Sequence, residues 1–298
     1  MKLHALGEVR LLAQLLPKFA PRKNIIAGAG DDCAVVAAPS SGNLLLLKTD
    51  CVVEGIHFET GADAVAIGWK ALARPLSDFA AMAGVPQFAL VTMIVPRVRE
   101  VVWVKKIYRG LQKAADKFEV AIVGGETSST SGPAVISVSV TGFVEKKRWI
   151  SRAGGKSGDE LFVTGCLGGS QSGRHLQFVP RIEEARWLTR HFPIHAMIDL
   201  SDGLGVDLPR LARASKLGFE VDEDALPRTR GRTIEQAIGD GEDYELLFAI
   251  SSARSPTLQR AWRMQFPRLP LTRIGYLNSR FKVQNPKWSG YVHFTERR

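Results

Sequence analysis

Short hydrophobic runs in the first half of the chain predict strands. Residues 43–49 and 88–95 consist largely of Leu, Val, Ile and Phe, which is typical of central strands in a covered sheet. Residues 135–144 alternate instead, because Ile136, Val138 and Val140 are separated by Ser or Thr. Such alternation predicts a further strand, with one face in the core.

Helical periodicity lies between these runs. From residue 100 to 117, apolar side chains recur at helical spacing with most Lys and Arg residues on the other side, which predicts a surface helix. Asp63 is suited to cap the N-terminus of a helix running to Ala73. Because proline lacks a backbone N–H, Pro75 is expected to interrupt it, with a second short helix starting near Ser77.

Further along the chain, strands and helices are mixed. Strands are expected at 119–123, 160–164 and 244–250, and a helix at 202–216. The first of these strands should end in a turn at Gly124-Gly125-Glu126, where glycine would let the backbone approach a phosphate. The glycine-rich segment 146–158 is suited to a domain connection. We predict a mixed α/β fold with two domains, residues 1–147 and 148–298.

Composition narrows the class of protein. The chain has 298 residues, enough for two domains of ordinary size, and no apolar run of the ~20 residues that a membrane helix needs. Its cysteines are Cys33, Cys51 and Cys166, an odd number at wide spacing that suggests neither a disulfide framework nor a zinc site. We expect a cytoplasmic protein with no membrane partner.

The formal net charge of +10 raises a nucleic-acid-binding alternative. The excess is concentrated in residues 254–298, which hold ten Lys or Arg and one acid, Glu296. Aromatic residues are interleaved there: Trp262, Phe266, Tyr276, Phe281 and Trp288. Salt-dependent binding of DNA or RNA would support this reading. We favour an enzyme of anionic ligands and expect no nucleic-acid partner, because that alternative leaves the acidic motifs unexplained.

Acidic residues lie at expected strand ends or beside glycine, where α/β proteins place their sites. Carboxylates that converge from several segments can hold Mg²⁺ against ATP phosphates, whereas a single Asp-Gly pair is usually a turn. In the segment 199–204, Asp-Leu-Ser-Asp-Gly-Leu, Ser201 is expected to cap a helix whose N-terminus attracts phosphate. Motifs of P-loop enzymes, dinucleotide-binding folds, serine hydrolases and zinc proteases do not occur.

The order of these motifs resembles the thiamine-monophosphate kinases. Gly30-Asp31-Asp32-Cys33-Ala34 is followed by Thr49-Asp50 and by Glu54-Gly55-Ile56-His57-Phe58. The resemblance continues through segments 70–73, 76–82, 124–127, 199–204 and 241–246 to the tail Trp288-Ser289-Gly290-Tyr291-Val292-His293-Phe294. The tail favours this family over aminoimidazole-ribonucleotide synthetase and selenophosphate synthetase.

The resemblance implies a two-domain aminoimidazole-ribonucleotide synthetase-like fold whose N-terminal domain forms a homodimer through its sheet. ATP, several Mg²⁺ ions and thiamine monophosphate would bind between the domains, and the product would be thiamine diphosphate. The implied metal ligands are Asp32, Thr49, Asp50, Asp78, Glu126, Asp199 and Asp202. The implied nucleotide contacts are Gly125, Glu126, Arg152 and Ser201, and the implied substrate contacts are His57, Glu242 and Tyr291. No general base is assigned, because the acceptor phosphate is already ionised.

Two positions depart from the family pattern. Lys48 replaces a Ser or Thr that often supplies a metal ligand, and Glu126 replaces the usual Asp. Both changes bear on the number of bound metal ions. They leave open a second reading, an ATP-binding enzyme of the same fold with a different acceptor or reduced activity.

Overall fold

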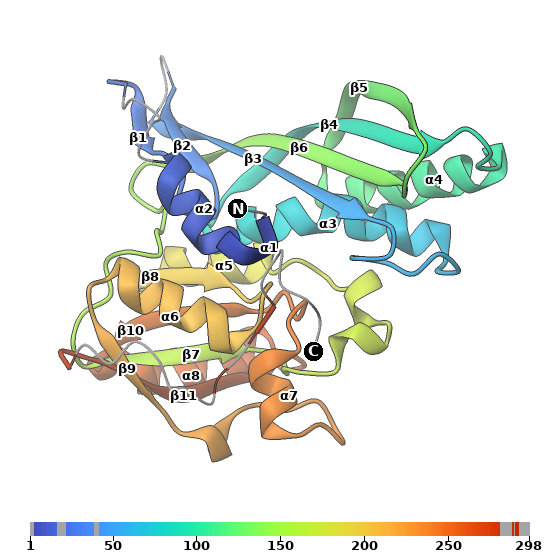
Figure 1. Ribbon diagram of the computed structural model, residues 1–298. Coiled ribbons are helices and arrows are strands. Elements are labelled where there is room, and N and C mark those ends of the chain that lie inside the picture. The colour runs from blue at the N-terminus through green and yellow to red at the C-terminus, as the bar shows by residue number, and fades with distance from the viewer. Residues whose placement is uncertain (1–2, 17–21, 39–41, 281–287, 289, 292–298) are drawn as a thin grey trace.

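The computed structural model describes residues 3–16, 22–38, 42–280, 288, 290 and 291. The chain forms two layered halves, one above the other in Figure 1. The first half contains α1 (Leu3–Leu6), α2 (Glu8–Leu15), β1 (Ile25–Ala27), β2 (Ala34–Ala37), β3 (Asn43–Val53), α3 (Ala64–Ala81), β4 (Val85–Pro96), α4 (Val101–Phe118), β5 (Ala121–Thr130) and β6 (Val135–Glu145). The strands expected near 43, 88 and 135 are therefore confirmed.

The first half is built on a six-stranded sheet in the order β1-β2-β3-β6-β4-β5. Its pairs are antiparallel except β4 with β5. Helices α3 and α4 cover one face, which Leu46, Val91, Ile136 and Val138 fill from the sheet. Alternation along β6 is as expected, since Ile136, Val138, Val140 and Val144 are buried in the core and the Ser and Thr residues between them are half-buried.

The other face of this sheet is open, so the expectation of strands covered on both faces is wrong. Leu45 and Leu47 of β3 and Phe88 and Leu90 of β4 are exposed, with 48% of Phe88 and 50% of Leu90 accessible. The register places Leu47 and Phe88 on either side of Thr141 of β6, so they share one face. The continuous hydrophobic runs therefore supply a core on one side and an exposed apolar surface on the other.

Helix α3 runs unbroken from Ala64 to Ala81, and the predicted interruption at Pro75 is wrong. Asp63 caps it as expected, with its carboxylate accepting from the N–H groups of Val65 and Ala66. An internal proline costs about 3 kcal/mol or more in an isolated helix. Here residues 71–73 and 75–81 are buried on both sides of the proline, and this packing outweighs the lost hydrogen bond.

Strand β5 passes straight through Gly124-Gly125-Glu126, so the predicted turn is also wrong. Gly125 is required by its neighbour strand: a Cβ there would lie 1.8 Å from the Val91 carbonyl oxygen. The glycines thus permit a close parallel pairing of β5 with β4. The helix expected at 100–117 is confirmed as α4, which buries Ile107, Leu111 and Ala114.

The second half contains a five-stranded antiparallel sheet in the order β8-β10-β7-β11-β9. Helices α6 and α7 pack on one face and α5 and α8 on the other, so this sheet is covered on both sides. Its elements are β7 (Asp159–Thr164), α5 (Ile182–His191), β8 (Ile194–Asp199), α6 (Leu204–Ala214), β9 (Gly218–Val221), α7 (Ile234–Gly239), β10 (Leu246–Ser251), α8 (Ser255–Gln265) and β11 (Leu271–Asn278), with short 3₁₀ helices at 170–172, 174–176, 223–225 and 252–254.

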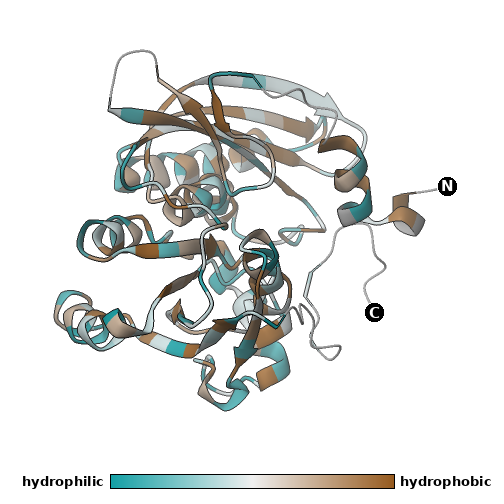
Figure 2. Ribbon diagram, turned by 90° about the vertical axis from the view of Figure 1, so that its left-hand side faces the viewer, coloured by the Kyte–Doolittle hydropathy of each residue, from teal (hydrophilic) through white to brown (hydrophobic). Residues whose placement is uncertain are grey.

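The two halves meet where α3 packs against α5 and β8, and one hydrophobic cluster runs from the first half into the second. In Figure 2 the hydrophobic positions lie along the strands of both halves. The boundary predicted at residues 147 and 148 falls in the connection between β6 and β7 and stays a prediction. In the described ranges no helix is long and apolar enough to cross a membrane.

Candidate active site

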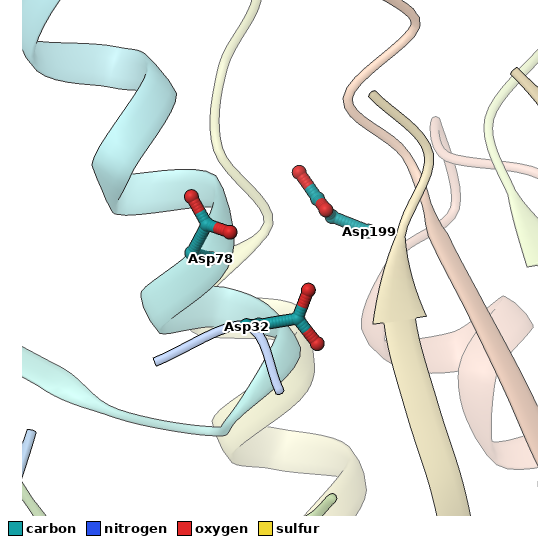
Figure 3. Close-up of side chains that lie close together, drawn as sticks. All are labelled: Asp32, Asp78 and Asp199. Atoms are coloured by element: carbon teal, nitrogen blue, oxygen red, sulfur yellow. The ribbon is translucent and has the colours of Figure 1, made fainter. Parts of the chain in front are cut away.

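Three buried carboxylates converge where the two halves meet. In the part of the chain that the structure describes, one ligand atom each from Asp32, Asp78 and Asp199 lies within 4.8 Å of the other two. Figure 3 shows them pointing toward one another from the loop before β2, from α3 and from the end of β8. Hard oxygen donors from separate segments are the ligand set that Mg²⁺ prefers, so the group fits a divalent ion.

Helix α3 contributes a polar stripe to this region. Lys70, Arg74, Ser77 and Asp78 are spaced so that they share one face of the helix. The Ser77 hydroxyl donates to Asp199 Oδ2 at 2.7 Å, which ties the helix to the end of β8. Sequence reading identified only Asp78 as functional, although polar residues four and three apart in an otherwise apolar helix were an available signal.

Lys48 reaches into the carboxylate group from β3. Its Nζ lies 2.7 Å from Asp78 Oδ1 and 3.8 Å from Asp50 Oδ2. Lys48 and Asp50 occupy the same face of β3 as the buried residues Leu46 and Val52. Burial opposes the charged form of Lys48, but the Asp78 and Asp50 carboxylates outweigh it and raise the pKa of the ammonium group above its usual value.

Arg152 holds Asp32 from the other side. Its guanidinium donates from Nη2 to Asp32 Oδ1 at 2.7 Å and from Nε to Asp32 Oδ2 at 3.2 Å, a bidentate pair. The neighbouring Asp31 accepts from the backbone N–H groups of Asp32 and Arg152. The expectation that Arg152 contacts the nucleotide stays a prediction, and its ion-pair partners among the described residues are Asp31 and Asp32.

The burial and close approach of these carboxylates shift the pKa values of Asp78 and Asp199. Burial, followed by the negative charge of Asp32, raises the pKa of Asp199 from 3.8 to about 7. Burial also raises the pKa of Asp78 well above its usual value, although Lys48 acts in the opposite direction. Repulsion between close, buried carboxylates makes their ionised forms costly, and a bound cation relieves that cost.

The segment after β8 folds differently from the expectation. Helix α6 begins at Leu204 with Gly203 at its N-cap, so the predicted cap by Ser201 is wrong. Asp207 inside the helix caps its N-terminus instead, because its Oδ2 accepts from the N–H groups of Asp202 and Gly203. Asp202 is paired with Arg210 at 2.5 Å. Asp207 has no glycine neighbour or strand end beside it, so no pattern in the sequence indicated this role.

One pocket joins all three implied substrate residues. His57 lies after β3, Glu242 before β10 and Tyr291 near the C-terminus, and together they line a pocket that also includes Ser201 and Asp202. Lys70 lies behind it, with its Nζ 2.7 Å from Glu242 Oε1 and 2.6 Å from the His57 carbonyl oxygen. Burial lowers the pKa of Lys70 to about 8, although Glu242 opposes this.

Arg74 and His175 also line this pocket and were missed by sequence reading. The Arg74 Nη1 donates to the Cys51 carbonyl oxygen at 2.7 Å, while its Nε has no hydrogen-bond partner among the described residues. A partly buried guanidinium with a free donor is suited to an anionic ligand.

The acidic residues of the loop before β10, residues 240–245, make different contacts. Asp240, Glu242 and Tyr244 line the pocket, and both Glu242 and Tyr244 adopt a left-handed backbone conformation. Asp243 instead accepts from the Gly168 N–H and from Arg174, and Glu245 is held by Arg181 and Thr164. Side chains other than glycine in this conformation are strained, and such strain is common at functional sites.

Two implied metal ligands lie on the open face of the first sheet. Thr49 is exposed and accepts from the Ser139 hydroxyl at 3.0 Å, and Glu126 is exposed on the edge strand β5 opposite Thr92. Gly125 lies in the next register position, on the same row as Val91. The structure therefore brings Asp32, Asp78 and Asp199 together, links Asp50 to them through Lys48, and leaves Thr49 and Glu126 outside this group.

Comparison with known proteins shows which family the chain belongs to. Residues 30–144 match the N-terminal domain of AIR synthase related proteins and residues 131–255 match the C-terminal domain. A thiamine-monophosphate kinase of Rhodopirellula baltica is 37% identical over 286 residues, covering 90% of this chain and 88% of that protein. The chain belongs to the thiamine-monophosphate kinase family. A further member, from Bacillus subtilis, is 31% identical over 93% of this chain and 93% of that protein.

Solved structures of the family share the fold. AaThiL complexed with AMPPCP and TMP superimposes with a TM-score of 0.83 at 31% identity, covering 98% of this chain and 99% of that one. Thiamine monophosphate kinase from Aquifex aeolicus gives a TM-score of 0.77 at 30% identity, covering 93% and 96%. The predicted family, enzyme class and two-domain fold are thereby confirmed.

Proposed function

We propose that this protein transfers the terminal phosphoryl group of ATP to the phosphate of thiamine monophosphate, which yields thiamine diphosphate. The observation that carries the proposal is the convergence on one face of α3 of the three-carboxylate group and the pocket lined by His57, Glu242 and Tyr291. Relatives across nearly the whole chain bear the name of this activity, and AaThiL was solved with AMPPCP and TMP.

In this proposal the pocket holds the thiamine monophosphate, and Arg74 contacts its phosphate. Asp32, Asp50, Asp78, Asp199 and Asp202 hold Mg²⁺, which when bound neutralises charge on the two phosphates that must approach each other. Ser201, Arg152, Gly125 and Glu126 are assigned to the nucleotide, and Thr49 and Glu126 to further ions. Phosphoryl transfer depends on positioning and charge neutralisation, so no residue acts as a general base.

The test is turnover. Purified protein is incubated with Mg-ATP and thiamine monophosphate, and the thiamine species are separated by chromatography. We expect thiamine diphosphate to form and EDTA to abolish its formation. ATP hydrolysis with no dependence on thiamine monophosphate would instead support the second reading, an enzyme of the same fold with another acceptor.

We further propose a homodimer formed through the open face of the first sheet. Leu45, Leu47, Phe88, Leu90 and Val123 expose an apolar surface there, and large patches of this kind mark interfaces. The domain boundary after residue 147 and a cytoplasmic location belong to the same proposal.

For the nucleic-acid alternative, Trp262 is buried and Trp288 stacks on Phe219, so neither offers a free stacking surface, while Phe281 lies outside the described residues.

Charge placed on this face should separate the subunits. The double variant Leu47→Asp/Phe88→Asp is expected to have the 32.7 kDa mass of one chain by light scattering after size exclusion, and wild type twice that mass. Carboxylates in an apolar interface lose hydration without a partner. Val98→Asp, at a position 92% exposed outside the sheet, is the control and should stay dimeric. A monomeric wild-type protein would contradict the proposal.

A further inference from the structure

Lys48 is a basic side chain to which the proposed function assigns no role. It stands among carboxylates that the proposed function assigns to metal ions. The Asp78 Oδ1 accepts from the Lys48 ammonium group, and Asp78 belongs to the three-carboxylate group. Asp50 is the next acid on the face of β3 that carries Lys48. Lys48 therefore lies at the junction between Asp50 and that group.

A divalent ion that bridged Asp50 and Asp78 would need the position that Lys48 now holds. Mg²⁺ binds oxygen at about 2.0–2.1 Å, so an ion shared by these two carboxylates must lie between their facing oxygens. The Lys48 Nζ already lies there, 2.7 Å from one oxygen and 3.8 Å from the other. Two cations in that space would repel each other strongly in a partly buried site.

The stem of Lys48 is held in place by the sheet. Its neighbours on the same face of β3, Leu46 and Val52, are fully buried, and its own side chain is only 22% exposed. The side chain thus enters the site from a rigid strand and not from a loop. Asp32 and Asp199 make no ion pair with Lys48 among the described contacts: Asp32 pairs with Arg152, and Asp199 accepts from the Ser77 hydroxyl.

We infer that the Lys48 ammonium group is a built-in cation that occupies one cation position, between Asp50 and Asp78. With Lys48 the protein therefore binds one divalent ion fewer at this position than it would with a neutral side chain at residue 48. The inference rests on the proposed function for the role of the carboxylates. It assigns the remaining position, among Asp32, Asp78 and Asp199, to a divalent ion.

Counting bound Mn²⁺ tests this directly. Mn²⁺ is titrated into the protein with AMPPCP present, and the free ion is followed by electron paramagnetic resonance. Lys48→Ser should bind one more Mn²⁺ per chain than wild type, whereas Lys48→Arg, which keeps the charge, should match wild type. Lys105→Ser, on the exposed side of α4, is the matched control and should also match it. Equal counts in Lys48→Ser and wild type would overturn the inference.

A second measurement uses the wild-type protein and does not depend on how the variants fold. Anomalous scattering from crystals grown with Mn²⁺ and AMPPCP should show no ion bridging Asp50 and Asp78, and Lys48 in contact with Asp78. A Mn²⁺ ion at that bridge, with Lys48 displaced, would refute the proposal. Both measurements count ions without turnover, so a protein that binds as expected but makes no thiamine diphosphate contradicts the proposed function alone.

Discussion

Asp199→Asn is expected to abolish most of the kinase activity while making the metal-free protein more stable. We expect kcat/KM for thiamine diphosphate formation to fall by about 10²–10³-fold, the usual loss when one fixed electrostatic group of a polar site is removed. Asn has the shape of Asp and can still accept the hydrogen bond from Ser77. The fold should therefore survive the change, and only the charge is lost.

The gain in stability follows from the same charge. Asp199 is buried beside Asp32, and this environment raises its pKa to about 7, so ionisation at neutral pH is costly without a cation. The Asn amide is neutral and can donate toward the neighbouring carboxylates. The melting temperature without metal should therefore be higher for Asp199→Asn than for wild type at neutral pH.

Three measurements together separate this role from a structural one. Turnover is measured by chromatography, melting by calorimetry and ion binding by Mn²⁺ titration, with Asp116→Asn on the exposed side of α4 as the control. Weakened Mn²⁺ binding should accompany the lost turnover in Asp199→Asn alone. A variant that turns over normally, or that loses activity because it melts at a lower temperature, would count against a metal-binding role.

The sequence predicted the elements whose pattern depends on a single buried face. Helix α4 follows its apolar spacing, and strand β6 follows its alternation, because each packs one face on the core. Leu47 and Phe88 were misjudged for a related reason: a continuous apolar run does not reveal whether its second face is covered by helices.

The other wrong predictions from the sequence arise from contacts between residues that are distant in sequence. Pro75 remains within a helix because the helix is buried on both sides of it, and Gly125 lies in a strand because Val91 leaves no room for a side chain. Local propensity yields to such contacts. The same holds for the site: the motifs identified Asp32, Asp78 and Asp199, but only the fold shows that they meet and that Lys48 enters beside them.

Mg²⁺ is expected to weaken or reverse the dependence of stability on pH. The raised pKa of Asp199 means that, between 3.8 and about 7, the folded protein holds a proton that the unfolded chain has released. Stability without metal therefore contains a contribution that is complete below the unfolded pKa and is lost as the pH rises through about 7. The burial of Asp78, whose pKa is also raised, acts in the same direction.

Because Mg²⁺ binds the ionised carboxylates, its stabilising effect should grow over the same interval. A ligand at 100 times its dissociation constant stabilises a folded protein by roughly 2.7 kcal/mol. Melting temperatures measured with EDTA should fall from acid to neutral pH, and those measured with Mg²⁺ should fall less or rise, so that the two curves separate most above pH 7. In Asp199→Asn this separation should shrink, since the variant lacks one carboxylate and its proton. Parallel curves with and without Mg²⁺ in the wild-type protein would mean that the three carboxylates take up no metal ion and that their charge is balanced by Lys48 and Arg152 alone.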